Sequence, residues 1–499
     1  MTGPGGRANL SVVIERCALD GGWADDVAFL VGDRAFTHAE VHSGAARTGS
    51  LLRASGAGPG ARVLLALPDG IEFAWAFLGA VRIGAVAVPV NPRLTAADHC
   101  AAAADADAAV VVCSAALAER FHGRRVVIGE DLEAATTWRP PADAAAVTAG
   151  DPAYAQYTSG TTGSPKSALH AHGHPAVYVE AFARPAIAIR RADVVLSVSK
   201  LYFAYGLGNS LFFPLLTGCR AVLHAGHPRP DEIAALVRRH RVTVLFSVPT
   251  FYAHLVAGGR PDDLPSVRVA VSAGEALGPA LAGRVRAFLG CPVLDGLGST
   301  EVGQTFASNT LERWDDATVG RALPPYRVSV RDDAGRACAP GRVGSLWVAG
   351  PTLPLGHPDE WLSTGDRAVL DTEGFLRLRG RSDDVELVGG ISVSPVEIEA
   401  VLSRHRAVIE VAVAGVVGPE GASRLEAFVV AAPGTAAGDG LEAELVALAR
   451  AELAPFKVPR SIVLVDGLPR TPTGKLRRFV LRAGGWGAQA PTSTPKRSR

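Results

Sequence analysis

A run of hydroxyl residues, glycines and one lysine follows an apolar, tyrosine-bearing stretch at residues 153–157. The run reads Tyr157-Thr158-Ser159-Gly160-Thr161-Thr162-Gly163-Ser164-Pro165-Lys166-Ser167. Small hydroxyl residues and glycines let backbone N–H groups approach an anion, and a lysine supplies the matching positive charge. The run is not a Walker A loop, because Pro165 stands where that motif requires its second glycine. Its composition is suited to binding a polyphosphate, although an ordinary flexible loop can have the same composition.

Two later segments, residues 272–277 and 295–301, place glycines beside a hydroxyl group and a carboxylate where strands are expected to end. Glycines at such points let a flat ring meet the backbone. Glu301 offers an oxygen ligand to a hard cation that bridges phosphates. Taken alone, Glu301 is better explained as a solvated loop acid, so its interpretation depends on the surrounding string.

An aspartate, an arginine and a lysine follow in short polar motifs nearer the C-terminus. Asp366 ends a Ser-Thr-Gly-Asp string, and Arg381 lies a short distance beyond it. One carboxylate can accept two hydroxyl protons, which suits a ribose, although a turn aspartate and a surface arginine would have the same pattern. Lys475 closes the Pro/Gly/Thr-rich loop at residues 469–475, where an exposed surface lysine is the plainer interpretation.

Three histidines at alternate positions, His170, His172 and His174, resemble a metal cluster at first sight. Alternate residues of a strand share one face, so the geometry is conceivable. No Cys, Asp or Glu stands beside them to complete a coordination sphere, and we therefore do not assign a metal here.

Bulk composition favours a cytoplasmic protein with a small-molecule partner. The chain has 499 residues, enough for two or three domains, and a net charge of +1 from 50 basic and 49 acidic residues. No basic excess supports binding to nucleic acid or to an anionic membrane. The N-terminus lacks the apolar core of a signal peptide, and the Ala/Val-rich run at 101–117 is too short and polar to span a bilayer. Six scattered cysteines without CxxC pairing are expected to be reduced and mostly buried: Cys17, Cys100, Cys113, Cys219, Cys291 and Cys338.

The elements that must position these motifs alternate between apolar runs and helical patterns over residues 25–360, which predicts layered α/β architecture with parallel strands. Strands are expected at 62–68, 85–90, 242–248 and 267–271. Helices are expected at 69–81, with Phe73, Phe77 and Val81 on one face, and at 231–240. Thr95 and Asp98 form the pattern of a capping box for another helix.

The pattern of apolar runs and helix signals in the sequence changes near residue 383. Ser394, Pro395 and Glu397 predict a helix start with a capping box. Strands at 408–417, 425–432 and 461–465 and a helix at 441–453 complete a small unit of ordinary domain size. We therefore predict an N-terminal domain at 1–382, a C-terminal domain at 383–483, and a disordered tail at 484–499 that is rich in Gly, Pro, Ser and Thr.

These motifs resemble, in their order and spacing from about residue 20 to 482, the adenylate-forming superfamily of acyl-/aryl-CoA synthetases, the AMP-binding enzymes. The resemblance implies a large N-terminal domain of layered β-sheets and helices and a small, mobile α+β C-terminal domain. It implies ATP, Mg²⁺ and coenzyme A, or the phosphopantetheine of a carrier protein, as reaction partners. A carboxylate would attack the α-phosphate of ATP, and a thiol would then attack the acyl adenylate. A rotating C-terminal domain would present different residues in the two steps.

The resemblance also implies roles for individual residues. Lys475 would bridge the substrate carboxylate and the α-phosphate, and Lys166 would steady the leaving pyrophosphate. Thr300 would contact phosphate, Glu301 would hold Mg²⁺, and Asp383 would be the hinge. The implied ATP-binding residues are Thr158, Ser159, Gly160, Thr161, Thr162, Gly163, Lys166, Gly274, Glu275, Ala276, Asp295, Gly296, Leu297, Thr300, Asp366 and Arg381. Among them, the segments around Gly274 and Leu297 would bracket adenine. Three positions depart from the family pattern and could lower the rate: Ser167, Leu297 and Leu387.

Residues 200–209 and 295–309 are similar to benzoate–CoA ligases and their hydroxybenzoate relatives. The implied aryl pocket consists of Phe203, near the thiol tunnel, with Ala204, Tyr205, Gly298, Gln304 and Thr305. Phe203 and Tyr205 could instead be plain core aromatics. Gln304 stands where benzoate ligases typically have His, and a buried amide needs a hydrogen-bond partner. We therefore expect a benzoate that carries a hydroxyl or amino group.

The sequence thus predicts an acid–thiol ligase that adenylates such a benzoate, releases pyrophosphate and transfers the aryl group to CoA. A stand-alone aryl adenylating enzyme that loads a carrier protein is the first alternative. A nucleotide-binding paralogue without catalysis is an alternative of another class. We expect a monomer or a homodimer.

Overall fold

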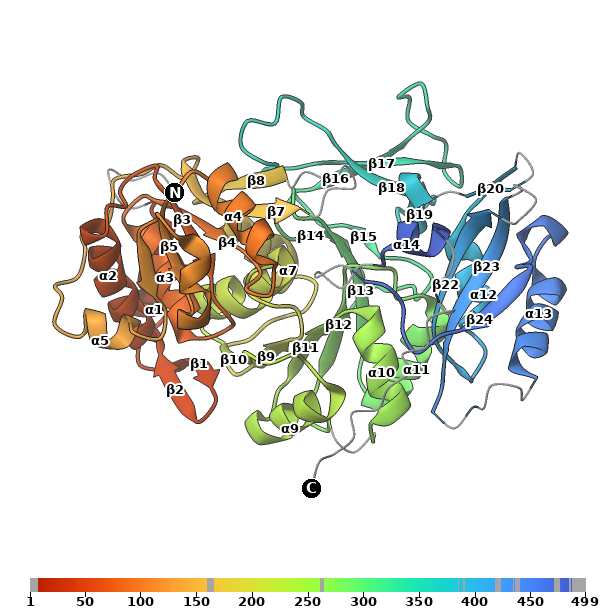
Figure 1. Ribbon diagram of the computed structural model, residues 1–499, viewed down its shortest axis with the longest axis horizontal. Helices are drawn as coiled ribbons and strands as arrows, with labels where there is room; N and C mark the ends of the chain where they lie inside the picture. Colours follow the sequence, from red (N-terminus) through yellow and green to blue (C-terminus); the bar gives the residue numbers. More distant parts are fainter. Residues whose placement is uncertain are drawn as a thin grey trace.

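The computed structural model describes residues 8–158, 166–260, 264–384, 386–388, 391–417, 423–433, 435, 440–470, 476–483 and 486. Two large β-sheets and a smaller antiparallel sheet make up the N-terminal part of the molecule, and a separate lobe at the other end carries the C-terminal strands (Figure 1). The elements predicted at 62–81, 85–105, 231–248 and 267–271 all form, within a few residues of the expected bounds.

The larger sheet has nine strands in the order β15-β14-β13-β12-β11-β9-β10-β1-β2. The run from β13 to β1 is parallel throughout, whereas β2, β14 and β15 are antiparallel additions at the two edges. The strands are β1 (Val27–Val31), β2 (Arg34–Thr37), β9 (Val194–Ser197), β10 (Arg220–Leu223), β11 (Val244–Ser247), β12 (Val269–Ser272), β13 (Val293–Gly298), β14 (Thr305–Ser308) and β15 (Arg321–Ala322). Parallel neighbours bring the carboxyl ends of β11, β12 and β13 to one edge, where ligands bind in open α/β sheets.

The second sheet has six strands in the order β6-β5-β3-β4-β7-β8, parallel except for β8, which turns back against β7. They are β3 (Arg62–Ala66), β4 (Val86–Pro89), β5 (Ala108–Cys113), β6 (Val126–Ile128), β7 (Pro152–Thr158) and β8 (Lys166–Ala171). The predicted phosphate loop connects β7 to β8, and its residues 159–165 lie outside the described part of the chain.

Helix α3 (Ile71–Arg82) packs in the hydrophobic core between the two large sheets. The sequence predicts one apolar face, but every residue from Phe73 to Val81 is buried, because the helix belongs to the core that the two sheets share. The other helices of the N-terminal part are α1 (Leu10–Asp20), α2 (His38–Ala54), α4 (Ala96–Asp105), α5 (Leu132–Thr136), α6 (His174–Tyr178), α7 (Ala204–Leu207), α8 (Phe213–Thr217), α9 (Pro230–His240), α10 (Pro249–Gly258) and α11 (Pro279–Leu289). The Thr95 capping box of α4 is present as predicted.

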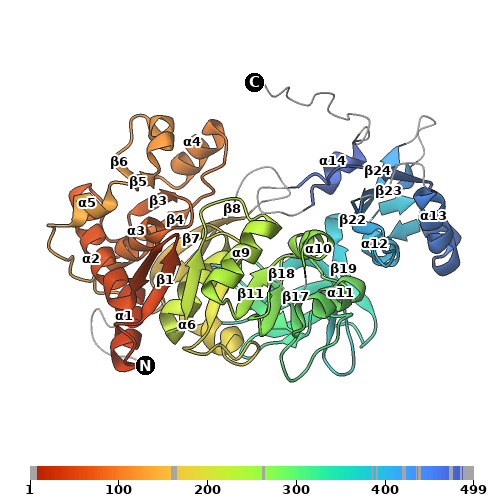
Figure 2. The same ribbon diagram turned by 90° about the horizontal axis from the view of Figure 1, so that it is seen from below.

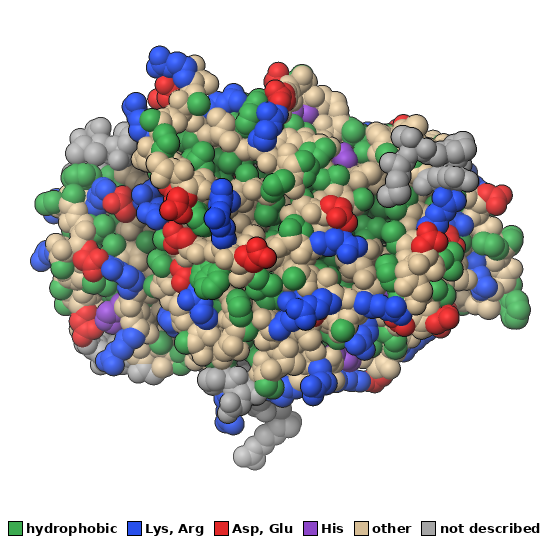
Figure 3. Space-filling model, turned by 180° about the vertical axis from the view of Figure 1, so that it is seen from behind, with side chains coloured by type: hydrophobic (Ala, Val, Ile, Leu, Met, Phe, Trp, Pro, Cys, Tyr) green, Lys and Arg blue, Asp and Glu red, His purple; other side chains and the backbone are tan. Residues whose placement is uncertain are grey.

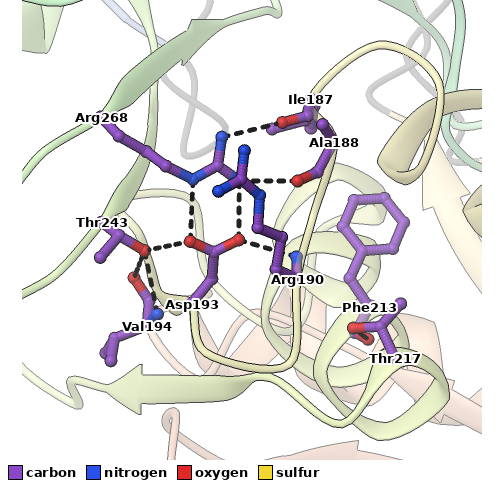
Figure 4. A network of polar contacts seen from close by, with 9 residues as sticks. All are labelled: Ile187, Ala188, Arg190, Asp193, Val194, Phe213, Thr217, Thr243 and Arg268. Carbon is purple, nitrogen blue, oxygen red and sulfur yellow. Dashed lines mark hydrogen bonds and ion pairs between the residues drawn. The ribbon is translucent and has the colours of Figure 1, made fainter.

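A buried ion pair fastens the loop before β9 to the large sheet (Figure 4). Arg268 donates two N–H groups to the Asp193 carboxylate at 2.8 and 2.6 Å, and its remaining N–H groups reach the carbonyls of Ile187 and Ala188. Thr243 donates its hydroxyl to the same carboxylate at 2.7 Å. Because these hydrogen bonds offset the cost of burying Asp193, whose side chain is 4% exposed, the network stabilises the loop in one position.

The expectation of parallel α/β layers up to residue 360 is wrong for the last part of that range. Residues 327–381 form an antiparallel sheet in the order β16-β17-β18-β19. Its strands are β16 (Arg327–Arg331), β17 (Val343–Ala349), β18 (Leu362–Leu370) and β19 (Leu376–Arg381). The connections between consecutive strands are loops without a crossover helix, and such connections favour antiparallel pairing.

The C-terminal lobe has its own hydrophobic cores and stands apart in Figure 2. It contains β20 (Glu386–Val388), β21 (Ile391–Val393), α12 (Pro395–Leu402), β22 (Val408–Val417), β23 (Ser423–Ala431), α13 (Leu441–Glu452), β24 (Ser461–Leu464) and α14 (Arg478–Arg482). Strands β22, β23 and β24 form one sheet. The domain boundary after residue 382 stays a prediction, and most of the predicted disordered tail lies outside the described residues.

Two sequence expectations need correction. Ser394 is the N-cap of α12, but its hydroxyl donates to the carbonyl of Arg379 at 2.9 Å instead of capping the helix. Glu397, the expected partner in that box, pairs with Lys457 at 2.7 Å because tertiary packing offers a charged partner. The cysteines are free thiols, but Cys100 is exposed and only three of the six are buried.

The surface carries both signs of charge. Acidic and basic side chains are interspersed over the face in Figure 3, in keeping with the net charge of +1. Among the described residues, no helix has the length and apolar character needed to cross a membrane.

Candidate active site

The ends of β12 and β13 bring together the two glycine-bearing segments that the sequence singled out. Ser272 and Asp295 pair in register, and the Leu277 N–H donates to the Asp295 carboxylate at 2.9 Å. Gly274 has a φ of +97°, in the region that favours glycine, so the turn after β12 depends on this residue. Residues 274–277 and 295–298 therefore lie side by side, as the predicted adenine site requires.

Asp295 is the most perturbed carboxyl group of this site. Its side chain is buried, and Oδ1 has no hydrogen-bond partner among the described residues. Burial raises its pKa to about 8, against the lowering effect of the N–H groups of Leu277 and Gly296. An unpaired buried oxygen in such a position needs a hydrogen-bond partner, and the edge of a purine, which offers donors and acceptors, fits this arrangement.

The loop between β13 and β14 carries Thr300 and Glu301. The Gly303 N–H donates to the Ser299 carbonyl at 2.9 Å, and the Val302 N–H donates to the Ser299 hydroxyl at 3.2 Å. Gly303 has a φ of +87°, and a Cβ there would lie 2.0 Å from the Tyr178 hydroxyl. These contacts fix a tight loop with Glu301 half-buried, a carboxylate of the kind that Mg²⁺ prefers.

His170 holds this loop through a hydrogen bond, a role that was not predicted from the sequence. Its Nε2–H donates to the Thr300 carbonyl at 3.0 Å, and its ring stacks on Tyr154 with the centroids 4.9 Å apart. Burial lowers its pKa to about 3, so the imidazole is neutral at pH 7. Its Nδ1 then accepts from Nδ1–H of His174 at 3.3 Å. Within the described residues, no group of three or more His, Cys, Asp and Glu side chains gathers to hold a metal ion.

Asp366 and Arg381 lie opposite each other on β18 and β19, with 3.5 Å between the carboxylate and the guanidinium. Gly365 turns the chain with a φ of +75°, and a Cβ there would lie 2.6 Å from an Arg381 nitrogen. The strand pairing thus joins the two residues that the sequence assigned to the ribose. Asp366 keeps 18% of its side chain exposed, so a hydroxyl-bearing ligand can reach it.

Two of the predicted aryl-pocket residues, Gly298 and Thr305, contact Gln304. Its Oε1 accepts from the N–H and the hydroxyl of Thr305 at 2.9 and 3.1 Å, whereas Nε2 has no partner among the described residues. A Cβ on Gly208 would lie 1.8 Å from Nε2, and a Cβ on Gly298 would lie 2.8 Å from the Gln304 carbonyl. Gly208 therefore allows the close approach of Gln304 to the segment that follows α7, and Gly298 allows its close approach to the end of β13.

Tyr205 packs against the hydrophobic core. Its ring lies edge to face on Phe246 at 6.1 Å, and its hydroxyl donates to the Val271 carbonyl at 3.4 Å. Phe203 is half-buried, at the start of α7, and contacts Tyr202 with the ring centroids 4.6 Å apart.

Several predicted site residues cannot be placed. Ser159, Gly160, Thr161, Thr162, Gly163 and Lys475 lie outside the described residues. Thr158 and Lys166 end and begin described strands, and Asp383 belongs to a short helical turn, but the side chains of these three are outside the description, as is that of Leu387. Arg470 and Leu476, the described residues that flank positions 471–475, both contact Glu275 of the predicted adenine segment.

Comparison with known proteins decides the family. The model of the AMP-binding enzyme family matches residues 18–356, and that of the AMP-binding enzyme C-terminal domain matches residues 397–475. The chain belongs to the AMP-binding enzyme family. Similar proteins include p-hydroxybenzoic acid–AMP ligase FadD22 of Mycobacterium tuberculosis, 42% identical over 97% of this chain and 70% of that protein.

The benzoate–CoA ligase of Thauera aromatica is 38% identical to this AMP-binding enzyme over 90% of each chain. The crystal structure of a benzoate CoA ligase from Burkholderia xenovorans LB400 superposes with a TM-score of 0.88 at 36% identity, over 95% of this chain and all of the other. These findings confirm the resemblance to benzoate–CoA ligases, the adenylate-forming fold, and the expectation of an enzyme of the acid–thiol ligase class. The roles of individual residues stay predictions.

Proposed function

We propose that this AMP-binding enzyme adenylates a hydroxyl- or amino-substituted benzoate with ATP, releases pyrophosphate, and transfers the aryl group to the thiol of coenzyme A. The observation that supports the substrate is the buried Gln304 amide, whose Nε2 lacks a partner in the described structure. An unpaired buried polar group costs about 1–3 kcal/mol, and a polar substituent on the ring would remove that cost. The curated relatives named for p-hydroxybenzoic acid and 4-hydroxybenzoate support the same class of acid.

In the adenylation step, the chain's own residues would position ATP and polarise it. Asp295 would hydrogen-bond to the edge of the adenine ring, and Asp366 would accept from the ribose hydroxyls. His170 would keep the Thr300 loop in place beneath the phosphates. Lys166 and Lys475 would counter the charge on the leaving pyrophosphate and on the attacked α-phosphate. Mg²⁺ held by Glu301 would neutralise phosphate oxygens.

The domain division belongs to the same proposal. Residues 1–382 would bind ATP and the aryl acid, and residues 383–483 would rotate about Asp383 between the two half-reactions. The separate cores of the C-terminal lobe support this, because a unit with its own core can move without unfolding.

A second acceptor has one observation in its favour. The relative that is 42% identical is named as an AMP ligase, whereas the relative that is 38% identical is named as a CoA ligase. The adenylate could therefore be passed to the phosphopantetheine thiol of a carrier protein. Both acceptors present the same thiol arm, so the aryl and ATP sites would be identical.

One experiment separates these possibilities. Pyrophosphate release is measured for benzoate and for hydroxyl- and amino-benzoates, each with CoA, with a phosphopantetheinylated aryl carrier protein, and with neither. We expect release with a polar analogue, and thioester formation with CoA. A clear preference for unsubstituted benzoate would refute the substrate class, and no release with any acid would favour a catalytically silent paralogue.

A further inference from the structure

A network of ionisable side chains, Arg470, Glu275, Glu410 and His254, joins the C-terminal lobe to the predicted adenine segment. Arg470 donates one Nη to Glu275 Oε1 at 3.1 Å and the other to Glu410 Oε2 at 2.6 Å. The His254 Nε2 lies 2.6 Å from the other oxygen of Glu410. Glu275 follows β12 and His254 lies on α10, both in the N-terminal part, whereas Glu410 is on β22. The guanidinium therefore bridges the two parts of the molecule.

Arg470 lies at the start of the loop that carries Lys475, so its contacts act on that loop. Residues 470 and 476 pair as an isolated antiparallel bridge, and the Arg477 N–H donates to the Pro469 carbonyl at 2.8 Å. The Leu476 N–H also donates to Glu275 Oε1, at 3.2 Å. Both ends of the loop that carries Lys475 are thus fastened to one carboxylate oxygen of the adenine segment.

Arg470 and Glu410 are the better shielded members of the network, whereas Glu275 and His254 are partly exposed. The side chains of Arg470 and Glu410 are 22% and 8% exposed. Burial raises the pKa of Glu410, but hydrogen bonds from His254 and Arg470, with the charge of Arg470, outweigh it and leave the pKa below its ordinary range. Removing one partner from such a network leaves a buried charge uncompensated. A displacement of the lobe by more than a few ångströms would break the Arg470–Glu275 and His254–Glu410 contacts, whereas Arg470 and Glu410 would move together.

We infer that Arg470 is a positioning residue for adenylation: bridging Glu275 and Glu410, it holds the base of the Lys475 loop against the ATP site in this arrangement of the domains. The inference rests on the proposed adenylation activity. Since the contact with Glu275 depends on this arrangement, Arg470 contributes to the first half-reaction and not to thiol transfer, for which the lobe must move away.

The test separates the half-reactions in the full-length enzyme. Arg470→Ala is assayed for pyrophosphate release from ATP and aryl acid, and for thioester formation from chemically supplied aryl adenylate and CoA. We expect at least a tenfold fall in the first rate, with the second within about threefold of the parent enzyme. Arg470→Lys, which keeps one charge but cannot bridge both carboxylates, should recover part of the loss.

Arg477→Ala is the matched control, because it removes the same charge seven residues away at an exposed position stacked on Phe479. It should leave both rates unchanged. Equal losses in both half-reactions of Arg470→Ala would show a merely structural role, and no loss in either would show that the bridge is dispensable; each outcome overturns the inference. Absence of pyrophosphate release from the parent enzyme itself would instead refute the proposed function, and thioester formation from supplied adenylate would still be measurable.

Discussion

The Gln304 amide offers the sharpest test of how this enzyme chooses its acid. In Gln304→Leu the donor Nε2 disappears, and the volume of the side chain is nearly kept. With a polar substrate, the variant loses a hydrogen bond and buries the substituent without a partner, at a cost of about 1–3 kcal/mol. With unsubstituted benzoate no such bond is lost. The ratio of kcat/KM values for substituted and unsubstituted acid should therefore fall by about 5- to 150-fold.

The comparison is a thermodynamic cycle in which one change is in the enzyme and the other is in the substrate. Rates of pyrophosphate release give kcat/KM for benzoate and for each hydroxyl- or amino-benzoate, in parent and variant. The loss of the two bonds that Thr305 donates to Oε1 lowers activity with every acid alike, so it cancels in the ratio.

A matched control is available in Gln156, which is also buried and whose amide oxygen and nitrogen both lack partners among the described residues. Gln156→Leu makes the same chemical change on β7, and it should alter rates without altering the substituent ratio. A ratio that stays within twofold in Gln304→Leu for all polar analogues would refute the reasoning, since the amide would then not face the substituent.

Three other predictions concern stability and ATP binding. Arg268→Met should destabilise the protein by about 3–5 kcal/mol, seen as a lower thermal midpoint, because it leaves the Asp193 carboxylate buried without its cation; an unchanged midpoint would contradict this. Asp366→Ala should raise the KM for ATP by tenfold or more, measured at saturating aryl acid, since charged hydrogen bonds to hydroxyls contribute about 1.5–3 kcal/mol. Acid should destabilise the fold because burial lowers the pKa values of five histidines from 6.5. The pKa falls to about 3 for His170 and to about 4 for the other four: His38, His42, His172 and His174. The unfolded chain binds these protons first, so stability is lost as pH falls from 6.5 towards 4, by on the order of 3 kcal/mol per histidine; urea midpoints that stay constant over that range would contradict it.

Much of the chain follows from local sequence. The capping box at Thr95, the helix that begins at Pro230 and the strand from Val408 to Val417 form as predicted, because hydrophobic period and cap chemistry act over a few residues. The family itself could be recognised for a similar reason, since each motif is a short string. The prediction of parallel strands fails for residues 327–360, where the absence of crossover helices decided the antiparallel pairing.

Contacts between distant segments were decided only by the tertiary structure. His170 supports the Thr300 carbonyl across 130 residues, and Arg470 reaches Glu275 across 195. Neither contact could be predicted from nearby sequence, because an imidazole or a guanidinium can bind many partners. The partner that such a side chain finds depends on which strand ends the topology brings together. The sequence by itself determined the chemical groups of this enzyme and their order; the packing of two sheets and a lobe determined which of those groups touch.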